Sequence, residues 1–294
     1  MDINTYKLFV TVAETANISH SAILLGYTQS GISHSMKRME NEFGFKLFIR
    51  DRYGVHLTPV GNELLPKIRK LLTINEQVEQ FVSDVHGIET GTLNIGTFPS
   101  ISIHWLPKIL NNFHKNHPQI QIHLKEGGTN DLYNWVQNRQ IDFALYNLQP
   151  DQNIEFLPIK KDEFLALFPL DYPLDKNITA YPVKAFESRP FILSEPNIDH
   201  DIQQLLFEQH VTPNILYSSR DDYAIMSMVE NNLGISILPE LMISQRKKYL
   251  KTLPLDPPCF RELGIGLKSF ANASPAAQKF IYYILEYFNI STLP

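Results

Sequence analysis

The chain has 294 residues, 44% of them hydrophobic, with 13 Gly and 19 Pro, a composition that excludes collagen-like, low-complexity and disordered proteins. Cys259 is the single cysteine, which excludes an internal disulfide, and neither a charged leader nor an apolar run of membrane-spanning length occurs, so we expect a cytoplasmic protein. The formal net charge is −5, but residues 1–70 carry +3 and the remainder −8, which places the basic balance at the N-terminus.

The N-terminal residues predict a helix-turn-helix. Leu8, Phe9, Val12 and Ala16 recur at helical spacing, and residues 19–25 form a second short helix that Gly26 closes. A third helix is expected over residues 28–44, with Thr28 as its cap and Gly44 as its left-handed end. A Gly-containing turn of about three residues between two short helices is typical of this DNA-binding motif.

The third helix is amphipathic. One narrow stripe is apolar and the opposite side is polar and partly basic; the stripe comprises Ile32, Met36, Met39 and Phe43, and the polar side Ser30, Ser33, His34, Lys37 and Asn41. The apolar stripe would anchor the helix and leave the polar face free to read DNA. The alternative is a merely solvated helix face.

A small hairpin, the wing, is predicted after the third helix from residues 46–50, a turn at 51–54 and residues 55–57. Arg50 and Arg52 flank its tip. We expect Gln29 to pair with adenine edges, and Lys37 and both arginines to contact phosphates. The full set of expected DNA-binding residues is Thr28, Gln29, Ser30, Ser33, His34, Lys37, Arg50 and Arg52.

A long linker helix is expected from Pro59, because Thr58-Pro59 joins a capping hydroxyl to a proline at the first helical position. Its apolar positions alternate spacings of four and three and predict a pairing seam, formed by Leu64, Ile68, Leu71, Asn75, Val78, Val82 and Val85. Asn75 within such a seam can fix register. The seam therefore predicts a dimer, and the alternative is packing on the body of the same chain.

These residues resemble the LysR-type bacterial transcriptional regulators. The resemblance rests on the Ala-containing second helix, on Thr28-Gln29-Ser30 opening the third helix, on a Leu-Phe-x-Arg wing at 47–50 and on Leu-Thr-x-x-Gly at 57–61. It implies a winged helix-turn-helix at residues 1–58 and a linker and dimerisation helix with a hinge at 59–90. Ser21 and Ile23 replace alanines that are usual in the second helix. His34 and Lys37 lie at variable positions, so the operator sequence cannot be inferred.

From Thr92 onward the pattern changes to strands that alternate with helices, which predicts a parallel α/β arrangement with ligand sites at the carboxyl ends of strands. A first set comprises strands at 92–97, 119–126 and 141–147 and helices near 102–116 and from Thr129. A second set comprises strands at 163–169, 190–194, 214–218 and 234–239 and helices near 199–210 and 221–232. A strand at 262–270 and a helix at 274–289 would return the chain to the first lobe.

This second part resembles the two-lobed, periplasmic-binding-protein-like effector domain of the same family, through LPKILNNF, DFALYN and GISILP. The resemblance implies an effector domain at 91–294, with lobe I at about 91–162 and 265–294 and lobe II at about 163–264. It places a small effector between the lobes, against Ser100, Ile101, Ser102, Thr129, Asn130, Ser194 and Asp222. Hydroxyls and free amides at helix N-termini suit an anionic ligand, although such residues are also ordinary helix caps.

We therefore expect a dimeric or tetrameric regulator that binds double-stranded operator DNA and is modulated by a small, anionic metabolite, with RNA polymerase as a further partner. No cofactor and no metal is expected, because His114 and His117 lack a third ligand nearby. No P-loop, nucleophile elbow or dinucleotide glycine pattern occurs, so the chain is not expected to be an enzyme. The alternative is a solute-binding protein or enzyme on the same two-lobed fold.

Overall fold

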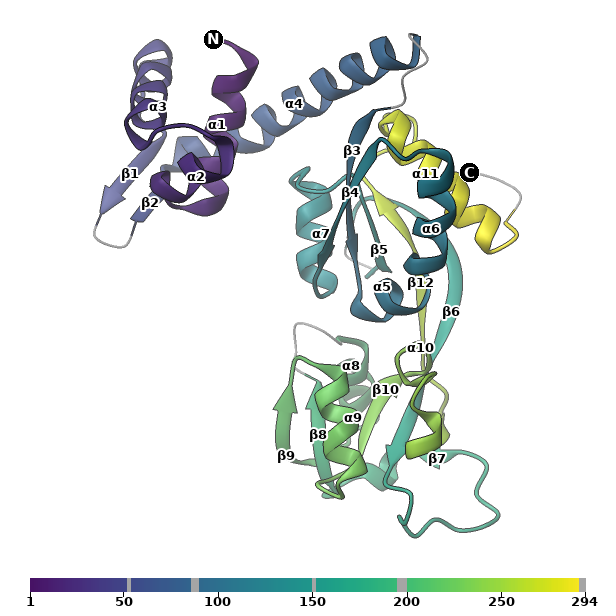
Figure 1. The fold of residues 1–294 in the computed structure, drawn as a ribbon. Helices are drawn as coiled ribbons and strands as arrows, with labels where there is room; N and C mark the ends of the chain where they lie inside the picture. The colour runs from purple at the N-terminus through teal and green to yellow at the C-terminus, as the bar shows by residue number, and fades with distance from the viewer. Residues whose placement is uncertain (52–53, 86–89, 150–151, 195–199, 291–294) are drawn as a thin grey trace. The chain divides into compact units, whose positions relative to one another are not determined.

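The computed structural model describes residues 1–51, 54–85, 90–149, 152–194 and 200–290 (Figure 1). The chain divides into two units, residues 1–91 with 138–140, and residues 92–137 with 141–294. Each unit is described by itself. Arg52, which was expected to contact DNA, lies outside the described residues.

Three helices form the helix-turn-helix of the N-terminal unit, as predicted: α1 (Ile3–Thr15), α2 (Ile18–Leu25) and α3 (Gln29–Phe43). Asp2, Asn17 and Thr28 cap their first turns through side-chain oxygens, and Gly26 and Gly44 end α2 and α3 in the left-handed conformation. Ala16 is the left-handed C-cap of α1 and not a member of its apolar stripe. The core between the helices contains Phe9, Ile32 and Met39, all fully buried.

The predicted wing is present as β1 (Phe48–Asp51) and β2 (Gly54–Leu57), which pair in antiparallel orientation. The base of the wing packs closely against the start of the next helix. A Cβ atom on Gly61 would lie 2.5 Å from the carbonyl oxygen of Leu47, so the two backbones approach each other as closely as glycine allows. Thr58 caps that helix through the N–H of Gly61 and donates its hydroxyl to the carbonyl of Lys46. The Leu-Thr-x-x-Gly motif thus fixes where the wing meets the linker helix.

The linker helix α4 (Pro59–Val85) begins where the sequence predicted. Its seam divides into two parts. Ile68 is 3% exposed and packs in the core of the N-terminal unit, with Leu64 against the same cluster. In contrast, Leu71, Val78 and Val82 are 40%, 56% and 49% exposed. Ile68 therefore packs against its own chain, which was the alternative to dimerisation. The later part of the seam, which contains Leu71, Val78 and Val82, exposes an apolar surface to solvent.

Lobe I of the second unit is built on a sheet with helices packed on it. It contains β3 (Gly91–Thr97), α5 (Pro99–His104), α6 (Leu106–Asn116), β4 (Ile120–Glu126), α7 (Thr129–Gln137) and β5 (Phe143–Asn147). The helix α11 (Pro275–Tyr287) returns to this lobe and buries Phe280 and Ile284 in its core. The single helix expected near 102–116 is two helices, because the chain breaks at Trp105 before Pro107.

Two long strands connect the lobes: β6 (Glu155–Phe168) and β12 (Phe260–Leu267) run from the core of lobe I into lobe II (Figure 1). They pair with each other in antiparallel orientation, and β12 is also antiparallel to β5. The parallel arrangement expected from the sequence was therefore wrong for these strands, whereas the α/β class is as expected. Parallel pairing is found for β3 with β5 and, in lobe II, for β8 with β9 and β7 with β11.

Lobe II contains the remaining elements. They are β7 (Tyr181–Pro182), β8 (Pro190–Ser194), α8 (His200–Glu208), β9 (Asn214–Ser219), α9 (Asp222–Glu230), β10 (Ser236–Pro239), α10 (Glu240–Ile243) and β11 (Lys251–Asp256), with 3-10 turns at Val183–Phe186 and Lys247–Tyr249. Its core is rich in aromatic residues, including Phe164, Phe168, Phe186 and Phe191. The strand β11 was not predicted, and its Pro254 weakened the strand pattern. Within the described residues, no helix is both long and apolar enough to span a bilayer.

Candidate DNA-binding surface and effector site

The polar face of α3 is open to solvent. Gln29, His34 and Lys37 are exposed and Ser33 is partly exposed, whereas Ile32, Met36 and Met39 are buried beneath them. Because the apolar stripe holds the helix on its core, the exposed face has a fixed orientation. Thr28 differs from the other expected contacts: its hydroxyl oxygen accepts the N–H of Gly31 at 3.0 Å, so its first role is to cap the helix.

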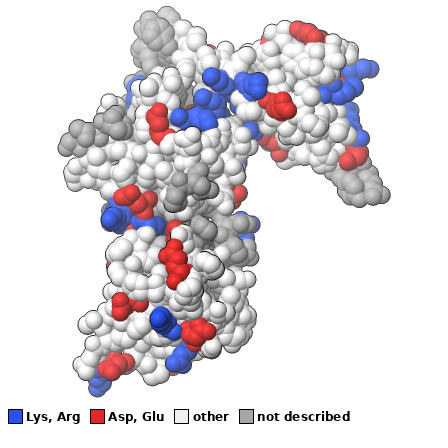
Figure 2. All heavy atoms as spheres, turned by 180° about the vertical axis from the view of Figure 1, so that it is seen from behind, with Lys and Arg blue, Asp and Glu red and all other residues white. Residues whose placement is uncertain are grey.

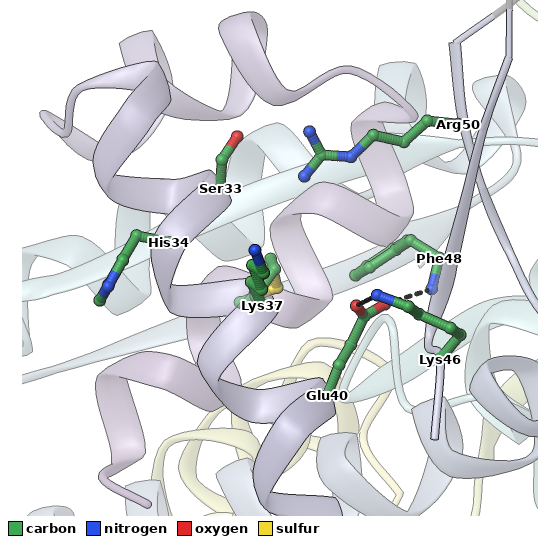
Figure 3. A pocket seen from close by; sticks show the side chains of 8 residues that line it. Ser33, His34, Lys37, Glu40, Lys46, Phe48 and Arg50 are labelled. Atoms are coloured by element: carbon green, nitrogen blue, oxygen red, sulfur yellow. Dashed lines mark hydrogen bonds and ion pairs between the residues drawn. The ribbon is translucent and has the colours of Figure 1, made fainter. Parts of the chain in front are cut away.

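A hollow of about 380 Å³ separates α3 from the wing (Figure 3). It is lined by Ser33, His34, Met36, Lys37, Glu40, Lys46, Phe48 and Arg50. In Figure 3 the guanidinium of Arg50 extends from the wing toward the side of the hollow formed by α3. Four of the predicted DNA contacts, Ser33, His34, Lys37 and Arg50, therefore line one hollow, whereas Gln29 lies on the exposed face of α3 outside its lining.

Glu40 lies at the floor of this hollow and was not predicted to belong to the site. Its side chain is 10% exposed and its carboxylate is bound by Lys46 at 2.7 Å. Burial opposes ionisation, but the hydrogen bonds from Lys46 and from the N–H groups of Leu47 and Phe48 outweigh it and lower the pKa of Glu40. The group is thus a carboxylate at neutral pH.

The distribution of Lys and Arg side chains on the surface of the N-terminal unit agrees with this arrangement. In Figure 2, Lys and Arg atoms gather along the edge of the N-terminal unit that carries α3 and the wing. Lys37 on α3 and Arg50 on β1 are both exposed and line the same hollow. Positive side chains beside a polar helix face provide the non-specific part of DNA affinity.

In the second unit, Ser100 lies where lobe I meets the strands that lead into lobe II. It is 3% exposed, and its hydroxyl oxygen accepts a hydrogen bond of 3.0 Å from Nη2 of Arg261 on β12. Arg261 in turn forms a buried ion pair of 2.8 Å with Asp162 on β6. The guanidinium centre lies 5.1 Å from the ring of Phe98, which precedes α5. The loop that was expected to bind the effector is therefore tied to the strands that connect the lobes.

Two of the residues expected to bind the effector, Ile101 and Ser102, make other contacts in the structure. Ile101 is fully buried in the core of lobe I, and its N–H is bonded to the carbonyl of Phe98. The hydroxyl of Ser102 donates to the carbonyl of Pro99 and to the carboxylate of Glu126, which would repel an anion. Helical spacing explains both outcomes, because consecutive residues of α5 point in different directions. These contacts give Ile101 and Ser102 structural roles, and their assignment to the effector site stays a prediction.

Thr129 takes part in a hydrogen-bond network that joins the lobes. Its hydroxyl donates to Oδ1 of Asn147 at 3.0 Å, and Nδ2 of Asn147 donates to the carboxylate of Asp201 at 2.7 Å. Gln149 donates to the other oxygen of Asp201 at 3.2 Å. Thr129 and Asn147 belong to lobe I, whereas Asp201 lies in the first turn of α8 in lobe II. Two side-chain amides of one lobe thus hold a carboxylate of the other.

The remaining expected contacts, Ser194, Asn130 and Asp222, are not members of this network. Ser194, at the carboxyl end of β8, is 2% exposed, and its hydroxyl has no hydrogen-bond partner among the described residues. Asn130 is exposed beside Thr129, and Asp222 is partly buried at the start of α9, where Asp221 is the cap. A buried hydroxyl without a partner is costly, which marks Ser194 as a site for a ligand group or a water molecule.

Sequence reasoning missed Asn147, Gln149, Asp201, Asp162 and Arg261. Asn147 could have been found, because it ends a strand whose five residues are all buried, and a polar side chain there requires a partner. Asp162 and Arg261 carried no comparable signal. They are opposite each other across β6 and β12, and that register is not readable from either segment alone.

The architecture and both sites define a DNA-binding regulator with an attached two-lobed ligand-binding domain. Comparison with known proteins agrees. Residues 3–62 match the family of bacterial regulatory helix-turn-helix proteins, lysR family, and residues 86–289 match the LysR substrate binding domain. The chain belongs to the LysR-type helix-turn-helix transcriptional regulators.

Individual relatives span the whole chain. The uncharacterized HTH-type transcriptional regulator YvbU of Bacillus subtilis (strain 168) is 31% identical over 291 residues, covering 98% of this chain and 99% of its own. Full-length OxyR C199D from Pseudomonas aeruginosa matches with a TM-score of 0.76 at 21% identity, covering 99% of this chain and 96% of that chain. The effector binding domain of QuiR in complex with shikimate matches with a TM-score of 0.60 at 23% identity, over 69% of this chain and all of its own. The fold class expected from the sequence is confirmed.

Proposed function

We propose that Gln29, Ser33 and His34 read the bases of the operator and that Lys37 and Arg50 supply phosphate affinity, together with Arg52. The support is the geometry of the N-terminal unit: the three reading residues lie on the exposed face of α3, and Arg50 reaches toward the same hollow from the wing. Such a helix enters the major groove with its N-terminal residues toward the bases. Each base contact then contributes discrimination, whereas the basic residues act on every sequence.

The second part of the proposal is a small, anionic effector that binds between the lobes at Thr129, Asn147 and Ser194. One observation carries it: amide donors of lobe I already hold a carboxylate, that of Asp201, at 2.7 and 3.2 Å. An effector carboxylate would satisfy the same donors if it replaced Asp201, and the hydroxyl of Ser194 would offer a further hydrogen bond. Exchange of an internal carboxylate for an external one changes what holds the lobes together, which couples binding to lobe arrangement.

The regulator would act in the cytoplasm as a homodimer or homotetramer. The exposed part of α4, with Leu71, Val78 and Val82, supports pairing of two chains, because an apolar strip of this kind is buried in a partner or destabilising in water. At promoters that it activates, contact with RNA polymerase would complete its function. The relatives are transcriptional regulators, and no observation favours catalysis as the main role.

Thermal shift tests the effector site directly. A panel of small carboxylates and phosphates is screened on the full chain, and a hit at a hundredfold excess over its dissociation constant should stabilise it by about 2.7 kcal/mol. Thr129→Ala and Ser194→Ala should weaken that stabilisation. Ser102→Ala is the matched control, because its hydroxyl contacts Glu126 and should leave the shift unchanged. Equal stabilisation of wild type and both site variants would place the effector elsewhere.

A further inference from the structure

Glu40 is a carboxylate on the DNA-facing helix that binds the wing. Its Oε1 accepts the backbone N–H of Leu47 at 2.9 Å and that of Phe48 at 3.2 Å, and its Oε2 binds Lys46. Three consecutive residues at the base of the wing thus converge on one side chain of α3, and Figure 3 shows two of them, Lys46 and Phe48. No hydrogen bond of this kind is expected from a residue that serves only to solubilise the helix.

A negative charge at this place opposes DNA binding if it acts through charge alone, because the hollow above it is where phosphates and base edges would approach. Glu42 provides the comparison on the same helix. It is half-exposed and pairs with the N-terminal amine at 3.2 Å, and no hydrogen bond joins it to the described residues of the wing. The two carboxylates therefore carry the same charge but differ in what they hold.

The contact made by Glu40 is close to Arg50 along β1. Phe48 and Arg50 are two residues apart on β1, so their side chains share one face of the strand. Phe48 packs on Phe9, 5.4 Å between ring centroids, and Arg50 lines the hollow beside it. The hydrogen bond from the N–H of Phe48 to Glu40 therefore anchors β1 to α3 two residues before Arg50.

Other contacts hold the wing to the rest of the unit: the N–H of Val55 donates to the carbonyl of Ala16 at 3.0 Å, and the hydroxyl of Thr58 donates to the carbonyl of Lys46 at 2.8 Å. These partners lie at the end of α1 and directly before α4. The Glu40 carboxylate, in contrast, joins the base of β1 directly to the recognition helix.

We propose that Glu40 is a positioning residue for DNA binding, which holds the wing against α3 so that Arg50 and the face of α3 contact one duplex together. The inference rests on the proposed assignment of Arg50 to a phosphate. It predicts an effect opposite in sign to that of charge alone. Removal of the carboxylate should weaken DNA binding, although it removes a negative charge from a DNA-binding surface.

The test uses the full chain and a fluorescent duplex that carries an operator selected from random sequences. Binding is titrated by anisotropy at several salt concentrations. Glu40→Ala should lower the affinity about tenfold near 0.1 M salt and reduce the salt slope by about one, as expected for one lost phosphate contact. Arg50→Ala should do the same. The double variant should be no worse than either single variant, because the contact is lost only once.

Three further variants separate positioning from charge and from folding. Glu42→Ala removes the same charge from α3 and should leave affinity unchanged or slightly higher. Glu40→Asp keeps the charge but shortens the side chain by one methylene, so it should show the same loss in milder form even if Glu40→Ala unfolds. Glu40→Gln retains an acceptor for both N–H groups and should restore most of the binding.

Three results would overturn the inference. Undiminished binding by a folded Glu40→Ala or Glu40→Asp variant would show that the wing does not depend on the carboxylate. Additive losses in the double variant would show that Glu40 acts independently of Arg50, while the assignment of Arg50 to a phosphate would stand. An Arg50→Ala variant with an unchanged salt slope would remove both that assignment and the positioning role.

Discussion

Arg261 and Asp162 face each other across the antiparallel strands β12 and β6 and form an ion pair of 2.8 Å whose side chains are 4% and 5% exposed. The second oxygen of Asp162 accepts the N–H of Leu241 in α10, and Arg261 also donates to Ser100. The pair therefore connects the expected effector loop of lobe I with the strands and the short helix that lead into lobe II. A movement of one lobe against the other must rearrange or rotate this pair.

Removal of one partner of this pair should be strongly destabilising. Asp162→Ala leaves the Arg261 guanidinium buried without its counter-charge, which should lower the free energy of unfolding by about 3–5 kcal/mol. Urea denaturation followed by circular dichroism measures this loss. The double variant Asp162→Leu with Arg261→Met should recover a large part of it, since no charge is left buried.

Glu240→Ala supplies the control, because its pair with Lys247 is exposed on both sides and should contribute less than about 1 kcal/mol. If Asp162→Ala cost no more than Glu240→Ala, the pair would not be a structural element of the hinge.

The linker helix should respond differently at two positions of its seam. Val78→Glu places a charge on the 56% exposed part of α4, which should dissociate the oligomer and leave the secondary structure intact. Ile68→Glu places the same charge in the 3% exposed part and should unfold the N-terminal unit. Light scattering together with circular dichroism distinguishes the two results.

Lys70→Glu, an exposed change on the same helix but outside the seam, should alter neither property. A Val78→Glu protein that keeps the wild-type mass would exclude this part of α4 as the main interface. Asn75 is compatible with a paired and with a dissociated chain, because its amide donates to Glu79 of the same chain at 2.8 Å.

Much of the N-terminal unit could be predicted from the sequence, since its signals are local. Thr28, Gly44 and Pro59 mark helix ends by their own side-chain and backbone chemistry, and the structure confirms the bounds they imply. The role of the seam could be predicted only in part. Periodicity shows that Ile68 and Val78 share one face of the helix, but it does not show which of them is buried by the chain itself.

The effector site depended on long-range geometry and could be predicted only in part. Ser100 and Thr129 were identified at helix starts, but their partners Arg261 and Asn147 lie 161 and 18 residues away. Ser102 looked equivalent to Ser100 in the sequence, and only the direction of α5 distinguishes a hydroxyl beside Arg261 from one beside Glu126. The arrangement of strands in the sheet was mispredicted for the same reason, because β12, from near the C-terminal end of the sequence, lies between β5 and β6.

Base readout and phosphate affinity should separate in binding experiments. Gln29→Ala should cost about 1–3 kcal/mol at the selected operator and relax base preference at one position. Lys37→Ala should instead reduce affinity for all duplexes and lower the salt slope by about one. Lys115→Ala, on α6 of the other unit, is the control and should change neither quantity. A Gln29→Ala protein with full affinity and unchanged preference would contradict the assignment.

The stability of the protein should depend on pH through Asp142. Burial raises the pKa of Asp142 to about 6 from its ordinary value of 3.8, although the N–H of Asn94 donates to its carboxylate at 2.7 Å. The folded state thus binds a proton that the unfolded state releases, and stability should fall as the pH rises from about 4 to about 6. Asp142→Asn should remove this part of the pH dependence of Tm. An unchanged pH profile would show that Asp142 ionises normally in the fold.

Footprinting of the selected operator, titrated with protein in the presence and absence of a metabolite that raises Tm, tests most directly that effector binding controls DNA recognition. We predict that the metabolite shifts the operator affinity or the protected pattern in wild type, that operator DNA changes the affinity for the metabolite by the same factor, and that Thr129→Ala loses both effects. A metabolite that binds at Thr129 and Ser194 yet leaves the affinity and the protected pattern unchanged would contradict this coupling.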